Sequence, residues 1–189
     1  ARQLFIAQGY GATTVEQIAQ HAGVSKPTVF SAVGNKQLLL RAVRDVAIAG
    51  DDEPVAVAKR PAADRIRAEP DQRRAVALLA RHLTGVASRY AELHEVVHAA
   101  ADSGEDELRD LWQLEEDQRL TGARRWIEVL TDKGPLRPGL DPGTAVDLLW
   151  LLMSPDNYYR LVHRRRWTNK QYQRWLAAAI AQLLVAEHP

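Results

Sequence analysis

Two clusters of side chains in this sequence have the residue types and the spacing needed for chemistry. The segment from Ser25 to Thr28, SKPT, sets two hydroxyls and an ammonium close together, a combination suited to phosphate oxygens and base edges. The segment from His94 to His98, HEVVH, has the HExxH spacing. On a helix, that spacing lets two histidines bind zinc while the glutamate acts as general base. The first cluster indicates nucleic-acid binding and the second indicates a zinc hydrolase.

The SKPT cluster lies within residues 14–33, whose pattern is that of two short helices joined by a tight turn. Gly23 can end the first helix in the left-handed conformation without a Cβ penalty. Ser25 is a good N-cap for the second helix, and Pro27 fits that helix's first turn. The first helix has apolar residues at helical spacing, namely Val15, Ile18, Ala19 and Ala22. This pattern predicts a helix-turn-helix, in which one helix enters the DNA major groove and the other crosses the backbone.

The ends and faces of these two helices follow from the same pattern. A capping box can start the first helix at either Thr13 or Thr14, and the sequence does not choose between them. Val24 should fill the corner of the turn, while Val29 and Val33 should face inward. The residues expected to remain outside are Lys26, Thr28, Phe30 and Ser31.

The first fifty or so residues resemble the N-terminal domain of the tetracycline-repressor (TetR) family. The matching residues are Leu4–Phe5, Gly9–Tyr10, Thr13–Val15, Ile18–Ala19, Ala22–Ser25, Thr28–Phe30 and Gly34–Lys36 followed by Leu38–Leu39. A weaker resemblance to the family's last two helices covers Leu149–Trp150, Ser154–Pro155, Tyr158, Leu161–Val162, Trp167 and Tyr172–Trp175. In that family three N-terminal helices bind DNA, the larger C-terminal domain binds a small effector, and the last helices form the dimer.

The resemblance implies a set of DNA contacts. Lys26 and Thr28 would lie in the major groove with Ser25 at the helix start, while Thr14 and Lys36 would meet the phosphate backbone. Phe30, also at this surface, stands where a tyrosine is usual, so a phosphate hydrogen bond through that hydroxyl is lost. Ala32 replaces a common histidine or tyrosine, and Val33 a common phenylalanine. The free N–H groups at the start of this helix are also expected to point at phosphate or base edges.

Composition and charge agree with this interpretation. Residues 1–50 hold five Lys/Arg and two Asp/Glu, whereas the remainder holds twenty and twenty-two, so a mildly basic head precedes a mildly acidic body. The absence of cysteine excludes disulfides and thiolate metal sites and suits the cytoplasm. The sequence contains no apolar run long enough to span a bilayer. The chain starts at Ala1 without a methionine, so we expect the first helix to be cut short and residues to be missing before Ala1.

The chain is expected to be all-α and to divide at residues 48/49. Residues 1–48 would form the DNA-binding head, and residues 49–189 the effector-binding and dimerisation domain. A helix over residues 35–50 is expected to link the head to the body. The helices expected in the body span residues 61–69, 71–102, 105–131, 141–153 and 168–187, with a kink or interruption at Ser154–Pro155. The arginines that follow His163 are expected to form a solvated helix end.

Two sets of residues in the body are candidates for binding. The aromatic residues expected to line an effector pocket are Tyr90, Trp112, Trp126 and Trp150. Broad apolar stripes on the last helices favour a dimer interface formed by Leu148, Leu152, Trp175, Leu176, Ile180 and Leu183. The alternative use of these stripes is to complete the core of a single chain.

The HExxH segment lacks a suitable setting in the sequence. Glu115 and Glu116 lie downstream as possible third ligands, yet no strand is predicted on which a peptide substrate could lie. We therefore expect no metal, no cofactor and no enzymatic activity. The sequence predicts a cytoplasmic, homodimeric repressor that binds a palindromic operator in double-stranded DNA and is released by a small-molecule effector. A regulator controlled by a protein partner and an HExxH hydrolase are the alternatives.

Overall fold

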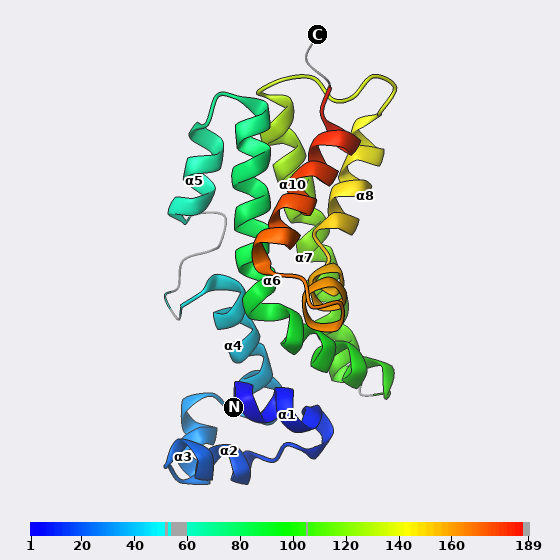
Figure 1. The fold of residues 1–189 in the computed structure, drawn as a ribbon. Coiled ribbons are helices and arrows are strands. Elements are labelled where there is room, and N and C mark those ends of the chain that lie inside the picture. The colour runs from blue at the N-terminus through cyan, green and yellow to red at the C-terminus, as the bar shows by residue number, and fades with distance from the viewer. Residues whose placement is uncertain (52, 54–59, 105, 187–189) are drawn as a thin grey trace. The chain divides into compact units, whose positions relative to one another are not determined.

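The computed structural model describes residues 1–51, 53, 60–104 and 106–186 (Figure 1). Apart from an isolated β-bridge between Leu136 and Val185, these residues form helices, turns and loops, which confirms the all-α expectation. The helices are α1 (Arg2–Ala12), α2 (Val15–Ala22), α3 (Lys26–Ala32), α4 (Lys36–Ala49), α5 (Pro61–Ala68), α6 (Gln72–Asp102), α7 (Asp106–Thr131), α8 (Pro142–Leu152), α9 (Pro155–Tyr158), the π-helical segment η2 (Tyr159–Arg164) and α10 (Asn169–Leu184). The described helices are too short or too polar to span a membrane.

Most helix ends lie where the capping residues predict them. Asn35, Asp141 and Thr168 each accept a hydrogen bond from the backbone N–H three residues later, as N-caps of α4, α8 and α10. Ser154 caps α9 by accepting from the N–H of Asp156, two residues later, so the expected interruption is a true helix boundary. The ends expected at residues 105 and 187 lie outside the described residues.

The chain divides into two compact units. The first unit comprises Ala1–Glu53 and Arg89–Glu115, and the second comprises Pro54–Ser88 and Glu116–Pro189. The long helices α6 and α7 each contribute to both units. The predicted head therefore shares its unit with the C-terminal part of α6 and the N-terminal part of α7, a grouping that helical periodicity does not indicate.

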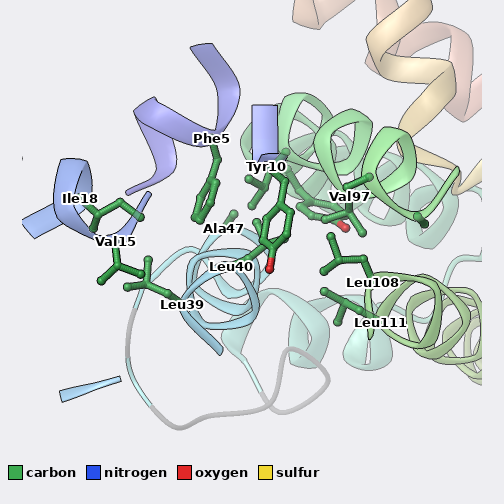
Figure 2. Close-up of a cluster of buried hydrophobic side chains, with 14 of the residues drawn as sticks. Phe5, Tyr10, Val15, Ile18, Leu39, Leu40, Ala47, Val97, Leu108 and Leu111 are labelled. Carbon is green, nitrogen blue, oxygen red and sulfur yellow. The ribbon is translucent and has the colours of Figure 1, made fainter. Parts of the chain in front are cut away.

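The core of the first unit joins α1, α2 and α4 to these parts of α6 and α7. Figure 2 shows the rings of Phe5 and Tyr10 close to α4, with Leu40 beneath them and Val97 on the far side. The two rings stack with centroids 5.9 Å apart, and Phe5 and Leu40 are fully buried. Burying side chains of this size stabilises the fold by about 1.5–3 kcal/mol each, so this core fixes α4 relative to α1.

In the second unit α8 and α10 lie side by side (Figure 1). Their facing residues are fully buried, among them Leu149, Leu176 and Ile180. Hydrogen bonds also connect the two ends of this unit's long helices. At the start of α6, Gln72 Nε2 donates to the carbonyls of Leu130 (2.9 Å) and Gly134 (2.7 Å). These contacts hold the C-terminal end of α7 against the start of α6.

This packing corrects part of the predicted dimer surface. Leu152, Leu176 and Ile180 are buried within the single chain, because α8 and α10 cover each other's apolar stripes. Their side chains therefore belong to the chain's own core. The other predicted interface residues, Leu148, Trp175 and Leu183, are half-buried, and the neighbouring Leu151 is 56% exposed.

Between α9 and α10 the chain runs through the π-helical segment η2, which the sequence pattern did not predict. Arg164, Arg165 and Arg166 at its end are exposed, and the Arg164 guanidinium lies 5.3 Å from the centre of the Tyr159 ring. Arg166 has a positive φ of 60°. This basic run is a solvated helix end, as expected.

Candidate nucleic-acid interface

The start of α2 is fixed by a capping box at Thr14. Thr14 Oγ1 accepts from the Gln17 N–H (3.2 Å), and Gln17 Oε1 accepts from the Thr14 N–H (2.9 Å). Thr13, the other candidate, is fully buried and donates its hydroxyl to the Gly9 carbonyl (2.7 Å). The structure thus chooses between the two boxes and leaves Thr14 exposed at the surface.

The turn between α2 and α3 has the predicted glycine geometry. Gly23 has φ 69° and ψ 26°, and the Val24 N–H donates to the Ala19 carbonyl (3.0 Å). Val29 is buried as expected, but Val24 and Val33 are 43% and 37% exposed. The expectations that Val24 fills the corner of the turn and that Val33 faces inward are therefore wrong.

The first turn of α3 satisfies most of its own polar groups. The Thr28 N–H donates to Ser25 Oγ (3.2 Å), and the Ser25 and Thr28 hydroxyls lie 2.7 Å apart. Pro27 has no N–H. Among Lys26, Pro27 and Thr28, this leaves the Lys26 N–H for an external acceptor. The first turn of α3 therefore presents exposed side chains more than a cradle of backbone N–H groups.

The outer face of α3 carries a cation held between two groups. Lys26 Nζ forms an ion pair with Glu16 of α2 and lies 5.9 Å from the centre of the Phe30 ring. The side chains of Lys26 and Glu16 are 46% and 60% exposed, and Phe30 is 45% exposed. The hydrogen bond from Lys26 lowers the pKa of the Glu16 carboxyl. Lysine, threonine and phenylalanine thus share one solvent-facing surface at the turn.

Lys36 has a different environment from that of Lys26. Its Nζ donates to the Tyr10 carbonyl (3.0 Å) and lies 4.1 Å from the centre of the Tyr10 ring, with its side chain half-buried. Lys36 therefore ties the start of α4 to the end of α1. The phosphate contact implied by the resemblance stays a prediction.

A buried polar network holds α4 from its other end. Arg44 Nε donates to Glu115 Oε1 (2.9 Å), and the Tyr90 hydroxyl donates to the other oxygen of Glu115. The side chains of Arg44 and Glu115 are 7% and 5% exposed. Burial raises the pKa of the Tyr90 phenol, and the Glu115 carboxylate raises it further. Arg89 adds hydrogen bonds to the carbonyls of Ala47 (3.0 Å) and Ile48 (3.1 Å) at the end of the same helix.

Sequence reasoning missed this network, although one signal was present. Arg44 falls four residues after Leu40 and three before Ala47, so helical spacing places a charged residue on the buried face of α4. Such a cation needs a partner. The partner could not be identified, because Glu115 is 71 residues away in the chain.

The two histidines of the HExxH segment both lie against Trp112. The rings of His94 and His98 are 4.8 Å and 4.4 Å from the Trp112 ring, and His94 is buried. Glu115 is held by Arg44 and Tyr90, while Glu116 pairs with Arg119. Within the described part of the chain, His, Asp and Glu residues form no group of three able to hold a metal ion.

The four predicted effector residues fall into two sets. Tyr90 and Trp112 belong to the first unit. Trp126 and Trp150 belong to the second, where Trp126 lies edge-on to His82 and Trp150 faces the guanidinium of Arg119. Tyr90 and Trp126 are buried. The effector pocket predicted from these residues stays a prediction.

Comparison with known proteins agrees with the helix-turn-helix geometry. Residues 1–43 match the model of the bacterial regulatory proteins, tetR family. Curated protein sequences give no significant match. Among solved structures, a protein assigned to the TetR-family transcriptional regulators from Mesorhizobium loti superimposes with a TM-score of 0.64 at 22% identity, over 95% of this chain and 89% of that one.

Two further structures share the fold. The ketosteroid transcriptional regulator KstR2 of Mycobacterium tuberculosis has a TM-score of 0.58 at 18% identity, over 98% of this chain and 91% of that one. A protein from a Rhodococcus species, also assigned to the TetR-family transcriptional regulators, has a TM-score of 0.57 at 16% identity, over 95% and 92%. Residues 1–43 thus match the N-terminal domain of the tetR family of bacterial regulatory proteins, and the chain shares its fold with solved structures assigned to TetR-family transcriptional regulators.

Proposed function

We propose that this DNA-binding regulator is a cytoplasmic repressor that binds a palindromic operator as a homodimer and leaves it when a small molecule binds. The observation that carries the proposal is the exposed set Thr14, Ser25, Lys26, Thr28 and Phe30 at one helix-turn-helix. Exposed hydroxyls and an ammonium on a short helix suit phosphates and base edges in the major groove. The buried core beneath α3, through Val29, Ile18 and Leu39, gives these side chains a fixed support.

The apolar part of this surface suits DNA as well. Phe30 cannot donate a hydrogen bond to phosphate, but its ring can contact the methyl group of thymine in the major groove. The proposal therefore assigns Phe30 to base contact and leaves the phosphate contacts to Thr14 and Lys36. Phosphate contacts would set the position of the head, and base contacts its sequence preference.

The homodimer proposal rests on the apolar residues that α8 and α10 leave uncovered. Leu151 is 56% exposed, and Leu148, Trp175 and Leu183 are half-buried on the same pair of helices. A two-fold contact between two copies would cover them and would match a palindromic site. Substitution of Leu151 by Glu should shift the sedimentation coefficient from that of a dimer to that of a monomer. An unchanged coefficient for this variant would place the interface elsewhere.

The direct test of DNA binding is selection of bound duplexes from a random-sequence pool. A palindromic duplex should be enriched, and a compound library can then be screened for release of that duplex. Quenching of tryptophan fluorescence by a releasing compound, repeated with Trp112, Trp126 and Trp150 each changed to Phe, would locate the effector. If no palindrome is enriched, the proposed operator is wrong. If a palindrome is enriched and only a protein partner releases it, the effector part of the proposal is wrong.

A further inference from the structure

The ion pair between Lys26 and Glu16 places a carboxylate on the surface that would face DNA. We propose that Glu16 is a specificity-determining residue, which withholds the Lys26 ammonium from phosphates and so lowers the affinity for DNA of arbitrary sequence. This inference rests on the proposed function and names the residue that sets its selectivity.

The contacts of Lys26 give the physical basis. Its ammonium pairs with Glu16 and lies over the Phe30 ring, so the free protein presents a cation that is already neutralised. Glu16 is 60% exposed, so it remains charged and solvated whether or not Lys26 stays with it. If Lys26 moved to a phosphate, it would lose its ion pair with Glu16 and gain one with the phosphate. The Glu16 carboxylate would then lie unpaired near the negatively charged DNA. Non-specific binding therefore gains little from this lysine.

The edge of a base can bind Lys26 without breaking its ion pair with Glu16. Guanine offers two acceptors, O6 and N7, to a lysine in the major groove, and a carboxylate can accept from the amino group of cytosine. The ammonium has three N–H donors, so it can donate to guanine while it keeps its bond to Glu16. A donor and an acceptor that are already in contact fit a G·C pair, whereas a phosphate satisfies the donor alone. The pair would thus favour one G·C position in each half-site.

Glu16 also has a structural role, because an acidic residue in the first turn of α2 interacts favourably with the helix dipole. That role affects helix stability and leaves the salt dependence of DNA binding unchanged. Salt dependence and the ratio of specific to non-specific affinity therefore separate the two roles. Neither the Thr14–Gln17 capping box nor the buried residues of α2 involve the Glu16 side chain.

The experiment compares the full chain with its Glu16→Gln and Glu16→Ala variants on two probes. One probe is the random-sequence duplex pool, and the other is the duplex that the unaltered protein enriches from that pool. Asp147→Asn is the matched control, since it removes one exposed carboxylate from α8 in the other unit. Alanine is included because glutamine can still accept a hydrogen bond from Lys26. Circular dichroism and the thermal midpoint check that each variant is folded.

Both Glu16 variants should bind the random pool up to about tenfold more tightly at about 0.1 M salt, because one more phosphate is neutralised. The slope of log K against log salt should become steeper by about 0.9 for the same reason. Affinity for the enriched duplex should rise less, so the ratio of specific to non-specific affinity falls, and a repeated selection should lose its G·C requirement. Asp147→Asn should leave this ratio unchanged.

The proposal is overturned if both Glu16 variants bind the random pool no more tightly than the unaltered protein. It is also overturned if the ratio stays constant, or if Asp147→Asn lowers the ratio equally, because net charge would then explain the change. A protein that enriches no duplex at all would instead refute the proposed function, and this result is seen before any variant is compared.

Discussion

Two ion pairs of the same chemical type lie in the first unit and differ in almost every physical respect. Lys26–Glu16 is 46% and 60% exposed at the surface of the helix-turn-helix, whereas Arg44–Glu115 is 7% and 5% exposed beneath α4. Both charges of the exposed pair are hydrated, so the pair contributes little to the free energy of unfolding. The buried pair lacks this hydration, and removal of one partner leaves an uncompensated charge.

The difference indicates a division of roles within one small unit. The exposed pair keeps both its donor and its acceptor accessible to DNA, and this is what the proposed contact surface requires. The buried pair fixes the helix that supports this surface. Hydrogen bonds from Tyr90 to Glu115 and from Arg89 to the end of α4 add to this support.

The largest expected effect is at the buried pair. Glu115→Ala should lower the free energy of unfolding by about 3–5 kcal/mol, because Arg44 then stays buried without its main counter-charge. Urea denaturation of the variant and of the unaltered protein measures this difference. Asp45, the other partner of Arg44 (2.6 Å), lies at the surface and is a poor substitute for Glu115.

A double variant sharpens the same comparison. Arg44→Met combined with Glu115→Leu removes both charges and keeps apolar volume, so much of the lost stability should return. A Glu115→Ala cost below about 1 kcal/mol would mean that this buried pair behaves like an exposed one. The buried and the exposed ion pair would then not differ in their contribution to stability.

The expected effect of Lys36 on stability lies between the effects of the buried pair and the exposed pair. Lys36→Ala should lower the free energy of unfolding by about 1–2 kcal/mol, because it removes the hydrogen bond to the Tyr10 carbonyl and the contact with the Tyr10 ring. DNA binding should weaken to a similar degree on all sequences. If Lys36 also meets a phosphate, the salt slope should flatten by about 0.9.

Lys36→Gln separates the two roles of Lys36, since it can keep the bond to the Tyr10 carbonyl without the charge. A stable glutamine variant with a flattened salt slope indicates a phosphate contact. An unchanged slope in both variants would leave Lys36 with the structural role alone. A changed sequence preference would mean that Lys36 reads bases.

The N-cap of α3 should have a smaller effect on stability. Ser25→Ala should cost about 1 kcal/mol, because it leaves the Thr28 N–H without its side-chain acceptor. Ser25→Thr, which keeps the hydroxyl, is the control and should retain most of the stability. Thermal denaturation followed at a helix-sensitive wavelength measures both. Equal midpoints for the alanine variant and the unaltered protein would contradict the capping role.

The smallest effect on stability is expected at the exposed pair. Glu16→Gln should leave the thermal midpoint unchanged within error, because both charges of the pair are well solvated. Differential scanning calorimetry of the variant provides the check. A large decrease would show that the pair stabilises the α2–α3 contact.

The parts of the fold that sequence predicted are those set by local chemistry. Gly23, Ser25, Asn35 and Thr168 fix helix ends through their own backbone or side chains, so a single segment contains the information. The glycine turn and the exposed positions of Lys26 and Thr28 are predictable for this reason. The same logic predicted α8 and the boundary at Ser154.

The parts that were missed depend on contacts between distant segments. Leu176 and Ile180 have the same stripe pattern whether a second copy or α8 covers them, and the structure shows that α8 does. The partner of Arg44 comes from α7, 71 residues away in the chain. The pairing of Lys26 with Glu16 depends on how α3 crosses α2. Helical periodicity does not show which distant segments pack against each other.

Whether Glu16 withholds Lys26 from phosphates is tested most directly by the salt-dependent affinity of the Lys26→Ala variant for the enriched duplex and for the random pool. We expect a large loss of affinity for the enriched duplex and a small loss for the random pool, because Glu16 already withholds Lys26 from phosphates. Equal losses on both probes, with a flattened salt slope, would contradict this expectation. Lys26 would then be an ordinary phosphate contact.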